Sequence, residues 1–357
     1  MNMESLGWTS SRQHQFEQYG SDGLLPARIA EEHRERYVVF GEFGERSAEI
    51  TGKLRFAAGS RLDFPAVGDW VAVQTGPNDS LAVIHAILPR TTTFVRKVAG
   101  ETTEPQLLAA NIDTVFLVTD LGLDFNLRRL ERYLTLAYES GASPVIVLNK
   151  ADLCPDVCER LTEIEKVAVG VPAHSVSAVT GAGMDLLLQY AKEGKTVALL
   201  GSSGVGKSTI INRLLGEERL LVKEIRQSDG RGRHTTTARQ MILLPSGGTV
   251  IDTPGMREIQ LWGEESSLDG TFEDIQSIAR RCRFADCTHT KEPGCAVQAA
   301  LAEGTISPER WESYRKLQRE LRHLERKQSI RARLNDKALW KYRAKLGKEI
   351  NRRKHGG

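Results

Sequence analysis

The feature that most constrains the fold of this 357-residue chain is a short glycine-rich motif. Gly201-Ser-Ser-Gly-Val-Gly-Lys-Ser208 matches G-x-x-x-x-G-K-[ST] and lies between an apolar run at 196–200 and a helical stretch at 207–216. In such a unit, backbone N–H groups face phosphates, Lys207 adds positive charge and Ser208 can bind Mg²⁺. A chance glycine-rich turn is the alternative. The predicted phosphate-binding residues are Gly201, Ser202, Ser203, Gly204, Val205, Gly206, Lys207, Ser208 and Thr209.

Short apolar runs alternate with helical stretches between about residues 110 and 262, which predicts an α/β fold. Both faces of such runs must be buried, as in a parallel sheet covered by helices. We expect strands at 114–118, 144–148, 173–176, 196–200 and 249–251, and helices at 127–140 and 207–216.

Two motifs that follow these strands carry the groups needed to recognise guanine. In Asn149-Lys-Ala-Asp152, the Asp152 carboxylate can accept hydrogen bonds from guanine N1–H and the 2-amino group, a pair that adenine lacks. Lys150 would lie along the base, and Asn149 would tie this loop to the phosphate-binding loop. A backbone N–H of Ser177-Ala178 could reach guanine O6, whereas a chance strand-end cap is the alternative. The predicted base-binding residues are Asn149, Lys150, Ala151, Asp152, Ser177 and Ala178.

The order of the motifs along the chain is unusual. Base-recognition motifs normally follow the phosphate-binding loop, but Asn149–Asp152 precedes it by about 50 residues. In Asp252-Thr-Pro-Gly255, Asp252 can hold Mg²⁺ through water and the Gly255 N–H can contact a γ-phosphate. All these motifs follow strand carboxyl ends and can meet in one crevice. The sequence therefore predicts a circularly permuted P-loop GTPase domain over residues 106–262.

The source of hydrolysis is a separate question, because Met256 stands where Ras-like GTPases carry a water-orienting glutamine. Either the intrinsic rate is low or another residue supplies this function. Asp229-Gly-Arg-Gly-Arg-His-Thr-Thr-Thr237 is the candidate switch I segment. We assign His234 as the catalytic residue, and the alternative is that it is an ordinary surface histidine. We assign Thr236 as a Mg²⁺ ligand together with Ser208.

Three of the five cysteines cluster in Cys282-x₄-Cys287-x-His289-x₅-Cys295. Three thiolates and one imidazole complete a tetrahedral Zn²⁺ shell with no position for water, so one structural zinc ion is predicted. Buried free thiols are the alternative. Cys154 and Cys158 have no further ligands nearby and are expected to be ordinary thiols. The predicted zinc ligands are Cys282, Cys287, His289 and Cys295.

The segments on either side of the GTPase domain are predicted to form further domains. Residues 1–34 are weakly patterned and are assigned as an N-terminal extension, and closely spaced short strands predict an OB-like β-barrel over 35–98. A zinc-binding, mostly helical module is expected over 263–307, followed by a basic helical tail over 308–357. Most strand aromatics of the barrel should be core residues, but some side chains could contact RNA. These candidates are Tyr37, Phe43, Phe56 and Arg61.

Charge is distributed unevenly along the chain. Residues 308–357 hold 17 Lys/Arg and 6 Asp/Glu, a net of +11, whereas all other residues hold 32 and 40, a net of −8. The surplus predicts binding to the phosphate backbone of a polyanion, with a solvated helix face as the alternative.

The permuted motif order, the barrel in front and the Cys/His cluster behind resemble the RsgA (YjeQ/YloQ) family of small ribosomal subunit biogenesis GTPases. The resemblance implies GTP hydrolysis stimulated by the 30S subunit, contact with its 16S rRNA and a late step in its maturation. It also implies a catalytic histidine at the position of His234. The resemblance covers roughly residues 35–320 and is most specific at Gly201–Thr209, Gly232–Thr237, Asp252–Gly255 and Cys282–Val297.

Composition excludes several other classes. Few cysteines, no apolar run of about 18 residues and no signal-peptide pattern argue against a secreted or membrane protein, so a cytoplasmic protein is expected. A monomer is expected because the sequence shows no heptad repeat and no strong apolar stripe. A non-enzymatic or weakly active GTP-binding RNA scaffold remains an alternative because of Met256. A P-loop kinase for a small metabolite is a second alternative, although it would have no use for Asn149–Asp152.

Overall fold

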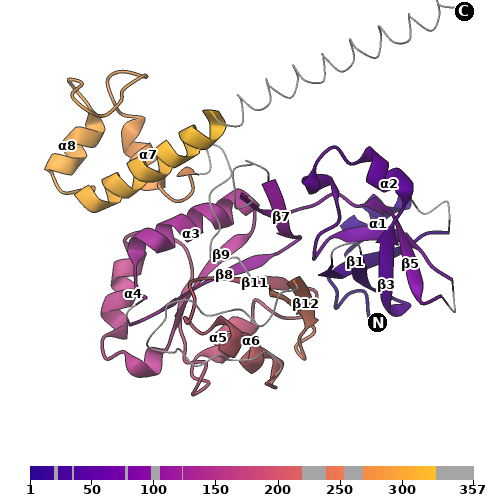
Figure 1. Ribbon diagram of the computed structural model, residues 1–357. Coiled ribbons are helices and arrows are strands. Elements are labelled where there is room, and N and C mark those ends of the chain that lie inside the picture. The colour runs from indigo at the N-terminus through magenta and orange to yellow at the C-terminus, as the bar shows by residue number, and fades with distance from the viewer. Residues whose placement is uncertain are drawn as a thin grey trace, which may run out of the picture.

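The computed structural model describes residues 1–19, 23–33, 36–76, 79–97, 105–122, 124–218, 239–252 and 268–326. A small β-barrel lies beside an α/β sheet, and a helical C-terminal part lies near α3 (Leu127–Ser140) of that sheet (Figure 1). Within these ranges, no helix has both the length and the apolar character needed to cross a membrane.

The elements follow one another in three groups. The barrel group contains α1 (Ser10–Glu17), β1 (Leu25–Glu32), β2 (Tyr37–Gly41), β3 (Gly44–Ile50), α2 (Gly52–Ala57), the 3₁₀ helix η2 (Arg61–Asp63), β4 (Trp70–Gln74) and β5 (Leu81–Ile87). The hairpin β6 (Thr93–Lys97) and β7 (Pro105–Ala110) leads to β8 (Thr114–Asp120), α3, β9 (Ser143–Asn149), η3 (Ala151–Leu153), α4 (Val157–Glu165), β10 (Ala173–Ser175), α5 (Met184–Leu188), β11 (Thr196–Leu200), α6 (Lys207–Leu215), β12 (Arg239–Leu243) and β13 (Thr249–Asp252). The C-terminal group contains α7 (Glu273–Ala279), α8 (Ala296–Ala302) and a helix that covers residues 308–326.

The α/β sheet has the strand order β10-β9-β8-β11-β13-β12. The first five strands are parallel, and β12 is antiparallel to β13. All residues of β8 and β11 are buried, as expected when helices cover both faces. All five predicted strands are present with ends shifted by at most two residues, so the predicted α/β fold is confirmed.

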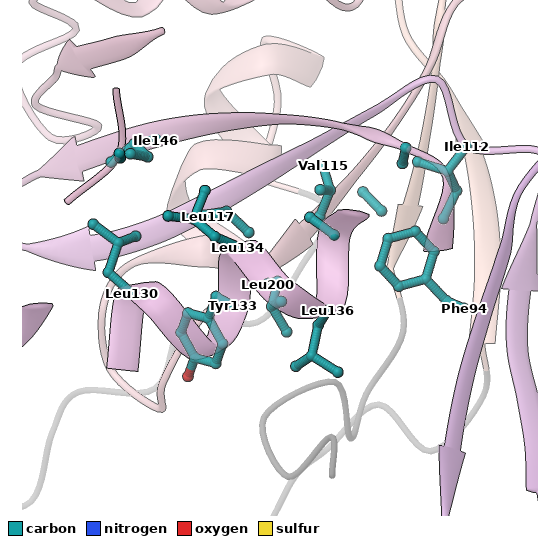
Figure 2. Close-up of a cluster of buried hydrophobic side chains, with 14 of the residues drawn as sticks. Phe94, Ile112, Val115, Leu117, Leu130, Tyr133, Leu134, Leu136, Ile146 and Leu200 are labelled. Atoms are coloured by element: carbon teal, nitrogen blue, oxygen red, sulfur yellow. The ribbon is translucent and has the colours of Figure 1, made fainter. Parts of the chain in front are cut away.

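Helix α3 covers one face of this sheet. It begins after Asn126, whose side chain accepts the Arg129 N–H, and ends at Gly141, which has a φ of 82°. Figure 2 shows how side chains of α3 pack on β8, β9 and β11, with Phe94 of β6 at the edge of the cluster. The labelled members are Phe94, Ile112, Val115, Leu117, Leu130, Tyr133, Leu134, Leu136, Ile146 and Leu200.

The barrel is closed, because β1, β2, β3, β5 and β4 pair in that order and β4 pairs back to β1. This confirms the predicted barrel, but its first strand differs from the prediction: β1 lies within residues 1–34, which were expected to be an extension. Arg28 interrupts the apolar pattern of β1 although it is only 2% exposed. Because a charged residue lies in the centre of β1, the sequence lacks the apolar pattern expected of a buried strand there, and β1 was not predicted.

The guanidinium of Arg28 joins three parts of the chain. It donates to the carbonyl of Leu6 in the N-terminal segment, to Gly68 O in the barrel (3.2 Å) and to Asn111 O before β8 (3.0 Å). Burial lowers the pKa of Arg28 to about 10, which still leaves it charged at neutral pH. The three carbonyl contacts offset part of the desolvation of this charge.

The barrel also continues into the α/β sheet through β1 and β12. Their antiparallel register pairs Glu31 with Gln240 and Glu32 with Arg239. Nη1 of Arg239 lies 2.9 Å from Glu32 Oε2 and donates to the carbonyl of Leu107 at 3.1 Å. The orientation of the barrel is therefore set by backbone pairing as well as by the Arg28 contacts.

The helix over 308–326 packs on α3 and α7 rather than forming a separate tail. The fully buried Glu131 of α3 accepts from Arg310 Nη1 (2.8 Å) and Ser313 Oγ (2.5 Å). Arg310 also forms a two-pronged ion pair with Asp274 at 2.7 and 2.8 Å. The sequence predicted a boundary between the zinc-binding module and the tail at residue 308, but the helix that begins there packs on the module. Residues 327–357 lie outside the described ranges. An apolar stripe of this helix is buried in the same hydrophobic cluster as side chains of α3 and α7, and its members are Tyr314, Leu317, Leu321 and Leu324.

Candidate functional site

Three loops that follow neighbouring strands meet at the carboxyl edge of the sheet. Asn149 ends β9 and Lys150–Asp152 follow it, the loop after β10 contains Ser177 and Ala178, and the loop after β11 contains residues 201–206. Strands β10, β9, β8 and β11 are consecutive in the sheet. Motifs that are separated along the chain are therefore brought together, as in other open α/β sheets.

The side-chain amide of Asn149 connects all three loops. Its Nδ2 donates to the carbonyl of Val205 at 2.8 Å, and its Oδ1 accepts the N–H of Ala178 at 3.1 Å. Gly206 has a φ of 96°, and a Cβ at that position would lie only 2.2 Å from Asn149 Nδ2. The predicted tie between Asn149 and the phosphate-binding loop is present, and it requires glycine at position 206.

The phosphate-binding loop packs closely against β8. A Cβ on Gly201 would lie 2.2 Å from the carbonyl oxygen of Val118, so only glycine allows this approach. Lys207 Nζ donates to the carbonyls of Gly201 and Ser202, each at 2.6 Å, which holds the ammonium group over the loop. The loop leads directly into α6, whose first N–H groups have no intrahelical acceptor and favour an anion.

Lys150 has a left-handed backbone conformation with a φ of 63°, and its ammonium lies 2.9 Å from Asp120 Oδ2 at the end of β8. Burial alone would raise the pKa of Asp120, but hydrogen bonds from Lys150 and from the backbone N–H of Asp124 outweigh it and lower the pKa. Ala151 and Asp152 follow in η3, and Asp152 is exposed. The loop thus holds its lysine while leaving the Asp152 carboxylate accessible.

A residue outside the sequence motifs holds the loop after β10. Arg213, in the last turn of α6, donates from Nε to the Ala178 carbonyl (3.2 Å) and from Nη2 to the Val179 carbonyl (2.6 Å). No local pattern links position 213 to this loop, so only the tertiary structure reveals it. A backbone N–H of Ser177 or Ala178 was expected to reach guanine O6. In this structure the Ser177 N–H donates to the Ala182 carbonyl (2.9 Å) and the Ala178 N–H to Asn149 Oδ1 (3.1 Å), so guanine O6 would have to share one of them.

The remaining predicted residues fall into two groups. Asp252 is the last residue of β13, which lies next to β11, and Ser208 and Thr209 occupy the first turn of α6. Asp252 and Ser208 therefore follow adjacent parallel strands at the edge of the sheet that carries the loops. Gly255, Met256, His234 and Thr236 lie outside the described residues.

The Cys/His cluster forms a second site in the C-terminal part. The ligand atoms of its four residues all lie within 4.8 Å of one another. Nδ1 of His289 is 3.5 Å from Sγ of both Cys282 and Cys295, and these two sulfurs are 3.9 Å apart. A tetrahedral ion with metal–sulfur bonds of about 2.3 Å needs S···S and S···N separations of about 3.8 and 3.5 Å. The cluster of Cys282, Cys287, His289 and Cys295 therefore fits a tetrahedral metal ion.

The loop that carries these ligands is held by Glu292. Its carboxylate accepts from the hydroxyl of Thr288 and from the N–H groups of Thr288 (2.9 Å), Thr290 (2.8 Å) and Lys291 (3.0 Å). The Thr288 hydroxyl and then the backbone N–H groups hold the pKa of Glu292 well below its usual range. His289 adopts a φ of 56° within this loop. The carboxylate thus stabilises an otherwise costly backbone conformation at a ligand.

In this chain, the base-recognition loops come before the phosphate-binding loop but lie beside it in the sheet, and this arrangement defines a circularly permuted GTPase. A family model described as RsgA GTPase matches residues 87–262. The small ribosomal subunit biogenesis GTPase RsgA of Opitutus terrae is 49% identical over 330 residues, which cover 90% of each chain. The chain therefore belongs to the RsgA GTPase family, and it is a GTP hydrolase.

Solved structures agree with this assignment. The crystal structure of YjeQ from Thermotoga maritima has a TM-score of 0.64 and 29% identity, covering 84% of this chain and 98% of that chain. YloQ, described as a circularly permuted GTPase, has a TM-score of 0.61 and 24% identity over 85% of this chain and 97% of that chain, and shows the same fold.

The Arg213 contacts yield a prediction about nucleotide affinity. We predict that Arg213→Met weakens GDP binding about 5- to 30-fold, because the loop at 178–179 loses two charge-assisted hydrogen bonds worth about 1–2 kcal/mol in total. Steady-state kinetics should show a raised KM with kcat little changed. Arg319→Met is the matched control, since Arg319 is exposed and, among the described residues, donates only to the carbonyl of Arg315. Equal GDP affinity in the two variants would contradict the role of Arg213.

The Cys/His geometry yields a prediction about metal content. We predict that purified protein carries one metal ion per chain and that Cys295→Ala, at the start of α8, loses it. The melting temperature should fall by several degrees, because metal binding contributes to folding free energy. Cys158→Ala is the control, since this exposed thiol lies outside the cluster. Mass spectrometry of the native protein measures the metal, and unchanged content in Cys295→Ala would refute the assignment.

Proposed function

We propose that this GTP hydrolase binds the small ribosomal subunit and acts in a late step of its maturation, with hydrolysis stimulated by the subunit. The observation that carries the proposal is the match to a protein named small ribosomal subunit biogenesis GTPase RsgA, which is 49% identical and covers 90% of each chain. A match of this extent includes the barrel, the GTPase domain and the C-terminal module. A shared partner is therefore a better explanation than a shared nucleotide site alone.

The nucleotide would bind across the three loops. The phosphates would lie on the loop at 201–206 and on the start of α6, with Lys207 beside them. Guanine would contact Asp152 and the loop after β10. Mg²⁺ would be held by Ser208, with Asp252 acting through water, since a hydroxyl and a carboxylate are the oxygen donors that this ion prefers.

Hydrolysis needs a group that orients water, and the sequence offers His234 in place of the missing glutamine. Thr236 would complete the Mg²⁺ ligands when GTP is bound. The described strand β12 begins directly after this segment and pairs with β1 of the barrel. Binding of the subunit to the barrel would therefore act through β1 and β12 on the segment of the sequence that carries the proposed catalytic residue.

Zinc is the metal that the Cys/His cluster suits best. Three thiolates and one imidazole form a soft donor set at tetrahedral spacing, which favours Zn²⁺ over Mg²⁺ or Ca²⁺. Four protein ligands leave no position for water, so the ion would stabilise the C-terminal module rather than take part in hydrolysis.

The 16S rRNA is the proposed contact within the subunit. Near the metal cluster, Phe284 is 42% exposed with the Arg283 guanidinium 5.5 Å from its ring centre, and Arg280 and Arg281 are also exposed. The net charge of +11 over 308–357 adds a large surplus of cations. Both features suit a phosphate backbone. We further propose that the protein acts as a cytoplasmic monomer.

Measurement of GTP turnover tests this function. Purified protein is assayed alone and with 30S subunits, 50S subunits or bulk RNA. We predict strong stimulation by 30S subunits only, and loss of that stimulation in His234→Ala with GTP affinity retained. Little turnover under every condition would contradict the proposal and favour a GTP-binding RNA scaffold.

A further inference from the structure

The turn that follows β8 lies beside the base-recognition loop, although no sequence motif includes it. This turn, here called the Asp120 turn, is formed by Asp120–Gly122 and Asp124. Asp120 ends β8 and pairs in register with Asn149, which ends β9, and the N–H of Leu121 donates to the Asn149 carbonyl at 3.2 Å. The Asp120 turn and the loop of Lys150–Asp152 therefore begin side by side at the carboxyl edge of the sheet.

The Asp120 carboxylate is fixed by its own turn. Its Oδ1 accepts the N–H of Gly122 at 3.1 Å and that of Asp124 at 2.9 Å. The hydroxyl of Thr119 donates to the Asp124 carbonyl at 3.1 Å, which closes the turn. The Asp120 side chain is only 11% exposed. Its second oxygen, Oδ2, is thus held in one place and is directed at a group outside the turn.

That group is the ammonium of Lys150. Its Nζ lies 2.9 Å from Asp120 Oδ2, and the lysine side chain is 27% exposed. Among the residues that the structure describes, Asp120 is the only acid that pairs with Lys150, because the neighbouring Asp124 pairs with Arg129 of α3 at 2.7 Å. An ion pair that is mostly shielded from water on both sides is ordered more firmly than a surface pair.

The backbone of Lys150 is held as well as its ammonium. This residue directly follows β9, and the next N–H along the chain, that of Ala151, donates to the Val176 carbonyl at 3.1 Å. The flexible four-carbon stem of the lysine is therefore fixed at both ends. An ordered stem presents a row of methylene groups to a ligand without the entropic cost of ordering a free lysine side chain.

We propose that Asp120 is a positioning residue for nucleotide binding, which holds the Lys150 ammonium so that the stem of this lysine lies along the guanine base. The edge of the base would be contacted by Asp152, whereas the stem would contact the ring without distinguishing one purine from another. Asp120 thus sets affinity rather than base specificity. The inference rests on the proposed function and deepens it, since it assigns a role at the nucleotide site to a residue outside the sequence motifs.

Asp120→Asn tests this role with little change in shape. The asparagine Oδ1 can still accept the two N–H groups of the turn, whereas an NH₂ group then faces the Lys150 ammonium in place of a carboxylate oxygen. Affinity for GDP should fall about 3- to 10-fold, and KM for GTP should rise by a similar factor with kcat little changed. The ratio of GDP affinity to inosine diphosphate affinity should stay unchanged, because Asp152 remains in place.

A double-mutant cycle shows whether Asp120 acts through Lys150. Lys150→Met removes the ammonium but keeps an unbranched stem, and it should weaken GDP binding at least as much as Asp120→Asn does. Addition of Asp120→Asn to Lys150→Met should then change GDP affinity less than about 2-fold, because the contact is already lost.

Asp113→Asn is the matched control, because Asp113 precedes β8 at the opposite edge of the sheet. Its carboxylate also combines a lysine with a backbone N–H, since Oδ1 lies 3.3 Å from Lys195 Nζ and Oδ2 accepts the N–H of Thr196 at 2.9 Å. This variant should bind GDP as tightly as the native chain. Isothermal titration of each full-length variant with GDP and inosine diphosphate measures all these affinities.

The outcomes separate the role of Asp120 from the proposed function. If Asp120→Asn and the native chain bind GDP equally, Asp120 does not position the lysine for the nucleotide, although the proposed function stands. If the two substitutions weaken GDP binding additively, or if Asp120→Asn loses discrimination against inosine diphosphate, the substitution acts by another route and the inference is wrong. If the native chain binds no guanine nucleotide, both the inference and the proposed function fail.

Discussion

The buried side-chain amide of Asn149 is the contact on which the proposed nucleotide site depends. It donates to the phosphate-binding loop and accepts from the loop after β10, so it holds three loops from three strands together. Each loop is anchored at the end of its own parallel strand. The connections between strands can therefore be rearranged, as in this permuted chain, without disturbing the relation between the loops. This explains how a reversed order of motifs still yields one site.

Backbone pairing and buried ion pairs connect this domain to the barrel and to the helix over 308–326. On the barrel side, β1 pairs with β12 and the buried Arg28 bonds to three segments. On the other side, Glu131 of α3 holds Arg310 and with it the helix that covers the metal-binding module. Buried charges of this kind are costly to leave without their partners, which favours a single arrangement of the parts. The barrel, the α/β sheet and the described C-terminal helices thus belong to one continuous framework.

Much of the site was predictable because its chemistry is local in sequence. The phosphate-binding loop, Asn149–Asp152 and the Cys/His cluster each lie within a few residues and follow recognisable strands or turns. Two of the failures have a common physical cause, which is the burial of charge. Arg28 concealed a barrel strand, and Arg310 resembled a cation of a solvated tail although it is buried against Glu131. Arg213 could not be found because its partners lie 34 and 35 residues away along the chain.

The central claim is that Asp152 and the distant phosphate-binding loop form one guanine-nucleotide site, and the affinity of Asp152→Asn for GTP and xanthosine triphosphate tests it directly. Asparagine can donate to the 2-oxo group of xanthine but cannot accept both guanine N–H groups as a carboxylate does. Asp152→Asn should lose GTP affinity by roughly 100-fold or more and gain affinity for xanthosine triphosphate. Unchanged GTP affinity, with no gain for the xanthine nucleotide, would show that Asp152 does not contact the base and would contradict the account.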